Sequence, residues 1–433
     1  MDCNLSFKKS RYNIVLPYDQ NQTIIYNTLS GAIGLMDVET KMRFDTDNLS
    51  PHEFNVFKSK GIIIPADYNE KTKVDSDRVA GIINKGKKHF RIWPTSGCNA
   101  NCYYCFEKGI KANTMNIETA NGVIKYITGF LQQNDTLEIE WFGGEPLLNT
   151  EVIDHISSKL IDVCNDLNCK FSSTIISNGS IIDDAIASKM KDKWKVKLIQ
   201  ITLDGFSNDY DLIKNYNNKK LYNFYRVIDN IRKVAECGIH VSLRMNYDTT
   251  NYESLVKLIN YLKHELSEYD DIYYYVYPVW SSFNEGSRDY FYSKTKADLN
   301  MLKLFDLIVT NGLNTPRQVS RLGYKPNQCL ACSDNSFTIL PDGSITKCSE
   351  AFFQVIGNIK EGIIDIDMYN YWTRRDLDQK CVECEYLPIC QGGCTASHFN
   401  QMPQCFGYRQ IIEEVIKWYV DKMIEKRSQI NLR

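Results

Sequence analysis

The segment TSGCNANCYYCFEKG, Thr95 to Gly109, contains Cys98, Cys102 and Cys105, and the whole chain contains 15 cysteines. Thiolates at such close spacing are soft ligands that suit zinc or iron–sulfur clusters. Structural zinc takes four ligands, and this segment offers three cysteines and no histidine. A four-iron cluster held by three cysteines would leave one iron open to chemistry. A zinc site that borrows a distant ligand, or plain buried thiols, are the alternatives at this point.

Composition indicates an ordinary globular protein without a strong charge bias. The 433 residues are 43% hydrophobic and 24% charged, with a formal net charge of −2, which gives no reason to expect nucleic acid or an anionic membrane as a partner. The first residues, MDCNLSFKKSRYNIV, lack a signal-peptide pattern, and no stretch approaches the ~20 apolar residues that span a bilayer. We therefore expect a cytoplasmic protein with reduced thiols, whose cysteines serve metal binding or catalysis.

Between about residue 90 and residue 280, predicted strands alternate with predicted helices. The strands are rich in β-branched and aromatic residues and most end at Gly, Asn or Asp: HFRIWP, LEIEWFGG, FSSTIISNG, VKLIQITLDG, HVSLRMNYD and DIYYYVYPVW. Segments such as NIETANGVIKYITGFLQQ have apolar residues at helical spacing. This rhythm predicts an α/β fold with a parallel sheet, open or curled toward a barrel. Ligands bind at the carboxyl ends of such strands, where the cysteine loop and the GGEP, SNG and LDG turns collect.

The residues before position 80 follow a different pattern. YNIVLPY and QTIIYNTLSG predict two strands, SPHEFNVFKSKG predicts a short helix capped by Ser50, and IIIP predicts a further short strand. Residues Asp67 to Arg78 are expected to form a polar linker. We expect residues 1–80 to be a small winged-helix-like module. The alternative is an extension that only packs against the barrel.

With these features in view, the sequence resembles the radical S-adenosylmethionine (SAM) enzymes. CNANCYYC resembles their cluster loop, and WFGGEPLL, about forty residues later, resembles their glycine-rich motif. The resemblance implies a partial (β/α)6 barrel in which Cys98, Cys102 and Cys105 hold the [4Fe–4S] cluster that cleaves SAM. It also implies that Gly143, Gly144 and Glu145 hold the methionine amino group of SAM. A tight turn is the alternative reading of GGEP.

Other positions match the pattern of this family less evenly. Thr202 stands where the family places a Ser or Thr against the SAM ribose, and Tyr104 is expected beside the adenine. The family's His-Asp pair and arginine are replaced by Tyr210, Asp211 and Lys214, and lysine keeps the charge of arginine but not its bidentate geometry. A further set of polar residues either contacts the cofactor or consists of ordinary strand-end side chains: Ser177, Asn178, Arg244 and Asn246.

After residue 320 the chain becomes rich in cysteine-containing loops. Their spacing resembles the SPASM extension of peptide-modifying radical SAM enzymes, with Cys329 as an eighth thiol. The resemblance implies two auxiliary [4Fe–4S] clusters, and so three clusters in all. The first would be held by Cys329, Cys332, Cys348 and Cys394. The second would be held by Cys381, Cys384, Cys390 and Cys405. One or two zinc sites are the alternative, because CxxC pairs also suit zinc.

The expected division of the chain follows from these matches. The radical SAM barrel is expected at residues 88–285, a linking helical segment at 286–320, and the SPASM domain with a C-terminal helix at 321–433. The remaining cysteines receive no role: Cys3, Cys164, Cys169 and Cys237.

The resemblance implies a 5′-deoxyadenosyl radical that abstracts a hydrogen atom from an unactivated carbon, while the protein supplies position and shelter. Two substrate classes dominate among the enzymes that this chain resembles. One is a ribosomally made precursor peptide that becomes cross-linked, and the other is a sulfatase whose Cys or Ser becomes formylglycine. The residues before the cluster loop favour the peptide, because peptide maturases often carry there a module that binds the leader peptide by β-augmentation.

The residue after Cys348 bears on the same choice. Sulfatase maturases of this type have an aspartate base there, whereas this chain has Ser349 and then Glu350. A displacement by one residue along a strand would turn Glu350 the other way, so Glu350 is a weaker candidate base. The sequence favours a peptide maturase that installs a thioether cross-link and takes electrons from a donor such as flavodoxin or ferredoxin. Sulfatase maturation, peptide epimerisation and a non-enzymatic zinc-binding adaptor are the alternatives.

Overall fold

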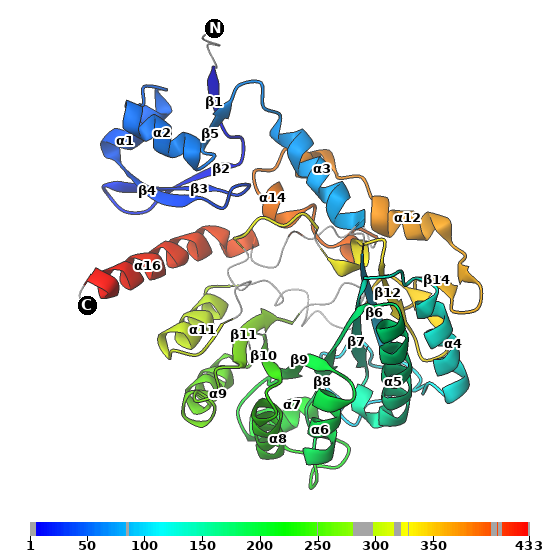
Figure 1. The fold of residues 1–433 in the computed structure, drawn as a ribbon. Coiled ribbons are helices and arrows are strands. Elements are labelled where there is room, and N and C mark those ends of the chain that lie inside the picture. Colours follow the sequence, from blue (N-terminus) through cyan, green and yellow to red (C-terminus); the bar gives the residue numbers. More distant parts are fainter. Residues whose placement is uncertain are drawn as a thin grey trace.

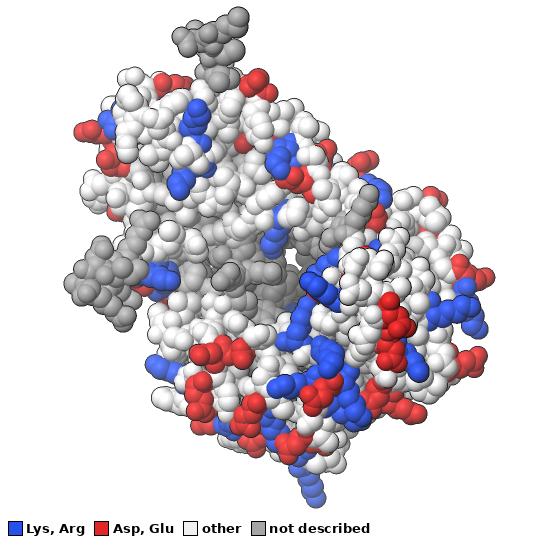
Figure 2. All heavy atoms as spheres, viewed as in Figure 1, with Lys and Arg blue, Asp and Glu red and all other residues white. Residues whose placement is uncertain are grey.

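The computed structural model describes residues 6–83, 86–248, 250–279, 298–315, 322–327, 329–399, 405 and 409–431. It consists of an N-terminal unit, a curved parallel sheet with helices on its outer side, and a C-terminal region of short elements and loops (Figure 1). No helix among the described residues is both long and apolar enough to cross a membrane. Figure 2 shows acidic and basic side chains intermixed over the surface that faces the viewer.

The N-terminal unit is built on two small antiparallel sheets. Strands β2 (Asn13–Pro17), β3 (Gln22–Asn27) and β4 (Ile33–Asp37) form one sheet in that order. Strands β1 (Phe7–Lys9) and β5 (Ile63–Pro65) form the other. The two predicted strands and the short IIIP strand are therefore present, and β1 and β4 are additional.

Two helices cover this unit, α1 (Val38–Asp45) and α2 (Pro51–Ser59). The predicted cap of α2 is confirmed, because the Glu53 amide donates to the Ser50 hydroxyl while the Ser50 amide donates to a Glu53 carboxylate oxygen at 2.8 Å. The unit has an apolar core of its own, formed by Ile25, Met36, Phe44, Phe57, Ile62 and Ile63.

The prediction of a polar linker from Asp67 to Arg78 is wrong, because helix α3 spans Glu70–Ile83. The helix buries Val74 against Tyr12 and Leu387. It also buries Glu70, which accepts from the Ser10 hydroxyl at 2.5 Å, while other charged residues pair nearer the solvent, as Lys73 does with Asp77 at 2.6 Å. Packing of a short apolar stretch against segments far away in the sequence therefore stabilises a helix that the composition of this segment does not predict.

The six predicted strands of the barrel are confirmed, and all of them are parallel to their neighbours. They are β6 (Lys87–Thr95), β7 (Thr136–Gly143), β8 (Lys170–Ser177), β9 (Val196–Thr202), β10 (His240–Tyr247) and β11 (Ile272–Pro278). Their spatial order follows the chain order from β6 to β11. The α/β fold class with a partial barrel is therefore confirmed.

Helices return the chain on the outer face of this sheet (Figure 1). They are α4 (Ile117–Thr128), the short η1 (Pro146–Asn149), α5 (Thr150–Asp166), α6 (Asp184–Asp192), α7 (Asn208–Lys214), α8 (Phe224–Glu236) and α9 (Tyr252–Glu265). Strand β7 shows how the two faces divide. Leu137, Ile139 and Trp141 are fully buried in the apolar core, while Glu138, Glu140 and Phe142 alternate with them on the inner side.

The C-terminal region continues the same sheet. Strand β12 (Ser336–Ile339) pairs in parallel with β6, and β13 (Ser344–Thr346), β14 (Val355–Asn358) and β15 (Gly362–Ile363) follow in antiparallel order. The sheet therefore has ten strands among the described residues. The C-terminal region is thus joined to the barrel through backbone hydrogen bonds as well as through side chains.

The rest of the C-terminal region that the structure describes consists of loops, short helices and one long helix, and most of its cysteines lie in the loops. The helices are η2 (Leu330–Cys332), α12 (Ile366–Arg374), α13 (Gln379–Val382), α14 (Leu387–Cys390), α15 (Thr395–Phe399), η3 (Arg409–Ile411) and the long α16 (Ile412–Asn431). Helix α11 (Leu299–Thr310) lies within the expected linking segment and contacts α16, because Trp418 donates from its indole nitrogen to Asp306 at 2.7 Å. Residues 286–297 and 316–320 of that segment, and Cys3, lie outside the described residues.

Candidate active site

The carboxyl ends of β6 to β9 lie side by side at one edge of the sheet, and the predicted cofactor residues follow them. Strand β6 runs directly into the cysteine loop, β7 ends at Gly143, β8 ends at Ser177 and β9 ends at Thr202. Sequence spacing alone therefore predicted the correct end of the sheet.

The cysteine loop is fastened to the end of helix α7. The Asn101 amide donates to the Lys214 carbonyl at 2.8 Å, and the Asn217 amide donates to the Asn99 carbonyl at 2.9 Å. Burial raises the pKa of Cys98 and of Cys105 to about 12, and it raises that of Cys102 as well. The loop therefore holds its three thiols partly buried, where the charged form of each is disfavoured.

The residues of this loop fit an iron–sulfur cluster. Three thiols in such an environment become thiolates only when a positive group compensates their charge, and cluster iron provides that charge. Burial is the largest cause that raises the pKa of Cys98, followed by the charge of Glu145. Cys102 and Cys105 add smaller contributions, so the three sulfurs lie close enough to influence one another. Within the described residues, no three His, Cys, Asp or Glu side chains form a group that could hold a single metal ion.

The two glycines of the GGEP turn are required by the backbone of the chain itself. A Cβ atom on Gly143 would collide with the Thr95 carbonyl oxygen, and one on Gly144 would collide with the Gly97 carbonyl oxygen. The Glu145 amide donates to the same Gly97 carbonyl at 2.9 Å. The glycines thus let the end of β7 pack directly against the start of the cysteine loop. Contact of Gly143 and Gly144 with SAM stays a prediction.

Glu145 is completely buried and surrounded by hydrogen-bond donors. The Ser177 hydroxyl donates to it at 2.9 Å and the Asn178 amide at 2.8 Å. Burial nevertheless raises the pKa of Glu145 to about 7. The Asn178 side chain reaches onward, to within 3.9 Å of the Cys98 sulfur. The structure therefore brings Glu145, Ser177 and Asn178 together beside the cysteine loop, and contact of these three residues with SAM stays a prediction.

Lys214 is also completely buried, and it joins the end of β9 to the cysteine loop. Its Nζ lies 2.7 Å from an Asp204 carboxylate oxygen, 2.6 Å from the Thr202 hydroxyl and 3.0 Å from the Tyr104 hydroxyl. Burial opposes the charge of the ammonium, but Asp204 holds the pKa of Lys214 well above its usual value. The predicted residues Tyr104, Thr202 and Lys214 are thus in mutual contact.

Asp204 is one of the site residues that were not predicted from the sequence. It accepts from the Tyr104 hydroxyl at 2.5 Å as well as from Lys214. Its position in LDG reads as an ordinary turn, and only its place directly after β9 could have drawn attention to it. Tyr104 is also reached by the Asn246 side chain at 3.2 Å, so the loop tyrosine is fixed to the barrel by three partners.

The interior of the barrel carries two arginines that face the C-terminal region. Arg244 donates to Asn246 at 2.8 Å and lies 4.4 Å above the ring of Tyr277. Arg91, which the sequence analysis did not consider, pairs with Glu140 and donates to the Ser349 hydroxyl at 2.6 Å. Arg91 on β6 thus contacts the loop after Cys348 directly, and Arg244 on β10 is influenced by the charge of Glu350 in the same loop.

The expectation that Glu350 would lie on a strand and point away is wrong. Strand β13 ends at Thr346, and Cys348, Ser349 and Glu350 follow in a turn. Burial, and next the negative charge of Glu350, raise the pKa of Cys348. Glu350 also acts electrostatically on Arg244. Because the chain has left the strand, the alternation of strand faces does not exclude Glu350 from the barrel interior.

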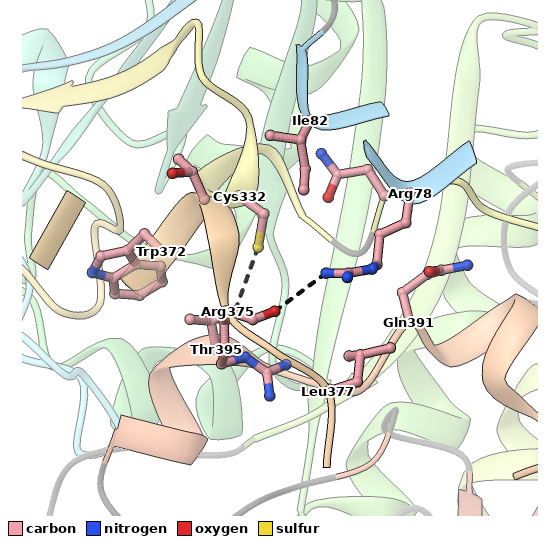
Figure 3. A pocket seen from close by; sticks show the side chains of 11 residues that line it. Arg78, Ile82, Cys332, Trp372, Arg375, Leu377, Gln391 and Thr395 are labelled. Atoms are coloured by element: carbon pink, nitrogen blue, oxygen red, sulfur yellow. Dashed lines mark hydrogen bonds between the residues drawn. The ribbon is translucent and has the colours of Figure 1, made fainter. Parts of the chain in front are cut away.

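The eight C-terminal cysteines separate into two neighbourhoods, which we call the first and the second auxiliary site. In the first, burial raises the pKa of Cys332 to about 11 and that of Cys394 to about 12, and Cys329 raises both further. Cys329 and Cys394 likewise act on Cys348. The Cys332 sulfur also lies 3.4 Å from the Thr395 hydroxyl (Figure 3).

In the second auxiliary site, the cysteines act on one another in the same way. Burial, Asp378 and then Cys405 raise the pKa of Cys381, and Cys405 also acts on Cys384. A hydrogen bond with the Cys390 side chain lowers the pKa of Cys405 to about 6. The cysteines that act on one another in each site are members of the same set of four that the resemblance implied. That each set holds a [4Fe–4S] cluster stays a prediction.

Comparison with known proteins agrees with this arrangement. Residues 92–262 match the family model described as the radical SAM superfamily. An uncharacterized protein of Methanocaldococcus jannaschii is 34% identical over 137 residues, which are 31% of this chain and 44% of that protein. This match therefore spans less than half of that relative.

Two characterised relatives match over a longer stretch. The radical SAM cyclopropyl synthase TigE of Paramaledivibacter caminithermalis is 23% identical over 97% of this chain and 96% of its own. A cysteine-type anaerobic sulfatase-maturating enzyme of Clostridium novyi is 24% identical over 78% of this chain and 95% of its own.

Solved structures share the fold. Native anSMEcpe with bound AdoMet superimposes with a TM-score of 0.60 at 19% identity, covering 79% of this chain and 99% of that one. Streptococcus suis SuiB bound to the precursor peptide SuiA superimposes with a TM-score of 0.53 at 16% identity, covering 93% of this chain and 98% of that one. At these identities the likeness concerns the fold.

Proposed function

We propose that this chain, whose residues 92–262 match the radical SAM superfamily, is a maturase that cross-links a ribosomally synthesised precursor peptide. The bond proposed first is a thioether. Its formation exchanges one carbon–hydrogen bond and one sulfur–hydrogen bond of the peptide for one carbon–sulfur bond, so the peptide loses two hydrogens. One hydrogen atom would leave with the radical that SAM supplies, and the thiol hydrogen would leave as a proton while its electron passes to an oxidised auxiliary cluster. The substrate would be a short peptide that contains cysteine.

The main support for this proposal is the share of this chain that each relative covers, which is larger for the peptide-type relatives than for the sulfatase-type ones. TigE matches 97% of the chain and SuiB, which has been seen with a precursor peptide, covers 93%. The sulfatase-maturating enzyme matches 78% and anSMEcpe covers 79%. The chain thus carries about a fifth more than the sulfatase-type matches use, and its N-terminal unit, residues 6–83, is of that size.

We propose that the N-terminal unit binds the leader of the peptide. Its three-stranded sheet has two edge strands, β2 and β4, because β3 lies between them. Unpaired strand edges accept an extended peptide through backbone hydrogen bonds. Val15 on β2 is an exposed apolar residue next to such an edge and could add a side-chain contact.

We further propose one SAM-binding cluster at Cys98, Cys102 and Cys105 and two auxiliary clusters, one at each auxiliary site. When bound, the first cluster and SAM supply one-electron chemistry that removes a hydrogen atom from carbon, and an external donor such as flavodoxin or ferredoxin supplies the electron. The chain contributes the thiol loop and Glu145 to receive the SAM amino group. Lys214 and Asp204 hold Tyr104 and Thr202 in place next to it.

Sulfatase maturation is the second candidate, favoured by the likeness to the Clostridium novyi enzyme. It requires a base near the substrate carbon. Ser349, directly after Cys348, is engaged by Arg91 and cannot act as a carboxylate base. Glu350 could take this role, because it lies in the turn beside Arg244 and the first auxiliary site.

The two candidates are separated by mass spectrometry after anaerobic co-expression. The peptide encoded beside this protein is expected to lose two hydrogens per event and to have a blocked thiol. The Cys98→Ala variant should abolish this change. An unmodified peptide, together with intact SAM cleavage by the same preparation, would contradict the cross-linking proposal for that peptide. A sulfatase peptide with Cys or Ser at its target position, converted to formylglycine, would establish the second candidate instead.

A further inference from the structure

One short segment belongs to both auxiliary sites. Cys390 is assigned to the second site and Cys394 to the first, and between them lie Gln391, Gly392 and Gly393 with φ angles of 53°, 81° and 76°. Three successive residues in the left-handed region are unusual and cost free energy at Gln391. The turn that they make brings the Gly392 carbonyl to two side-chain donors.

Those donors are Arg375, whose guanidinium lies 3.1 Å from the Gly392 oxygen, and His398, whose Nε2 lies 2.8 Å from it. The link between the two sites is therefore tied to a cation. In the part of the chain that the structure describes, Arg375 forms no ion pair with a carboxylate. Its neighbour Arg374 differs in this respect, because its guanidinium is paired with Asp334 at 3.0 Å.

The position of Arg375 relates it to both sites. Its guanidinium contacts the Gly392 carbonyl, which lies two residues from Cys390 of the second site and two from Cys394 of the first, and Arg375 lines the same cavity as Cys332. Two other cations lie beside one site each. The Lys347 ammonium donates at 2.5 Å to the carbonyl of Ser333, the residue after Cys332, and the Arg409 guanidinium lies 4.2 Å from the ring centre of Tyr386, two residues after Cys384.

Helix α3 holds Arg375 in this place. The guanidinium of Arg78 donates to the Arg375 carbonyl at 3.2 Å, and both residues line a cavity of about 30 Å³ together with Cys332 and Gln391. In Figure 3, Arg78 extends toward Arg375 from one side of the cavity, and Cys332 lines another side. This volume holds about one water molecule, so the cavity is no substrate site. The described residues that line this cavity with Arg375 and Cys332 include no carboxylate.

We propose that Arg375 is the shared counter-cation of the two auxiliary clusters and raises the reduction potential of both. The inference rests on the proposed function, because it requires that both auxiliary sites hold clusters. A cluster with four thiolate ligands is anionic, and reduction adds one more negative charge. A fixed cation nearby stabilises the reduced form, so its removal shifts the potential to more negative values. Arg375 is therefore a positioning and tuning residue that does not touch the substrate.

The test is a redox titration monitored by electron paramagnetic resonance, on the full chain purified anaerobically with all its clusters. In Arg375→Gln, both auxiliary midpoints are expected to fall. At a fixed solution potential near the midpoint, the ratio of reduced to oxidised cluster should drop about tenfold, which is ~59 mV for a one-electron couple. The cluster at Cys98 serves as the internal reference, and its midpoint should not change.

Three further variants make the outcome specific. Arg375→Lys keeps the charge and should stay close to the wild type. Arg374→Gln removes an adjacent arginine that is already paired, and should leave all midpoints in place. Arg409→Gln should shift one auxiliary midpoint only. If Arg375→Gln shifts one auxiliary midpoint or none, Arg375 is not a shared counter-cation and the proposal is wrong.

Loss of cluster iron would also be decisive. If Arg375→Gln loses iron from both auxiliary sites while Arg375→Lys retains it, the positive charge is needed to hold both clusters, which supports the proposal. If both variants lose iron alike, packing rather than charge is responsible and the proposal fails. Failure of the proposed function is distinguishable from either result, because the wild-type protein would then contain iron for fewer than three clusters before any variant is made.

Discussion

The barrel-end site and the C-terminal cysteine region, residues 329–399, differ in how much of their structure the chain supplies by itself. At the barrel end, the buried charges of Lys214 and Glu145 each have several protein partners. In the cysteine region, buried polar atoms of Trp372 and Gln391 have no hydrogen-bond partner among the described residues, and Arg375 forms no ion pair with any of them. The barrel end has such an atom too, Glu107 Oε2 in the cysteine loop, but its central charges are paired. Buried polar groups without partners are rare in finished structures.

This contrast suggests two ways of preparing for a cofactor. The barrel end is shaped by hydrogen bonds within the protein, so it should keep its geometry without SAM or iron. The cysteine region contains short helices and a left-handed turn between Cys390 and Cys394. Much of its stabilisation should come from the clusters themselves, since metal binding by thiolates contributes directly to folding.

The strongest test of the barrel end is removal of the Lys214 partner. Asp204→Ala leaves a completely buried ammonium without its carboxylate. Breaking a buried pair in this way costs about 3–5 kcal/mol, which denaturant unfolding of the metal-free protein can measure. Asp45→Ala is the matched control, because Asp45 pairs with Lys41 on the surface and exposed pairs contribute little. Equal effects of the two changes would mean that the Lys214 network does not shape the site.

A smaller effect is expected at the junction of β7 and the cysteine loop. Gly144→Ala would place a Cβ atom against the carbonyl oxygens of Gly97 and Ser96. Backbone cannot yield as a side-chain tip can, so we expect a cost of about 1–3 kcal/mol and weaker iron loading at Cys98. Gly34→Ala in β4 is the control, since a Cβ atom there meets nothing within 4 Å. If iron loading and stability are unchanged in Gly144→Ala, close packing of these segments is not a requirement of the site.

Removal of iron tests whether the clusters stabilise the C-terminal cysteine region more than the barrel. After chelation, amide hydrogen exchange in residues 376–399 should become at least tenfold faster, which corresponds to a loss of about 1.4 kcal/mol in local stability. Exchange in strands β7 to β10 should hardly change, because these strands are central in the sheet and their outer faces are buried. Uniform acceleration across the whole chain would instead show that the clusters stabilise barrel and cysteine region alike.

The parts of the fold that the sequence predicted are those with local patterns. The six barrel strands alternate with amphipathic helices, and Ser50 with Glu53 forms a capping box that is visible in sequence. Helix α3 was missed because the apolar contacts of Val74 lie with Tyr12 and Leu387, far away in the sequence. No local pattern contains that information.

The same distinction applies to the site. The cysteine spacing and the GGEP turn led to the correct end of the sheet, because strand ends can be located from sequence. Asp204 and Arg91 could not be identified in this way, since their importance comes from Lys214 and from Ser349, which other segments bring to them. The position of Glu350 was misjudged because the end of β13 at Thr346 was not predicted.

Glu145 offers the finest test, because burial keeps this carboxyl group partly neutral, as it also does Glu107 in the cysteine loop. The Glu145 pKa of about 7 lies above the ordinary value near 4.5, so the folded metal-free protein binds a proton that the unfolded chain releases. Its contribution to stability must therefore decrease as pH rises from about 5 through 7. Between pH 6 and pH 7, wild type should lose about 1 kcal/mol of unfolding free energy relative to Glu145→Gln, as denaturant unfolding at each pH can measure. A difference that does not vary with pH would mean that the carboxylate is already charged in the empty site, and that the barrel end is fully prepared for the cationic amino group of SAM before it binds.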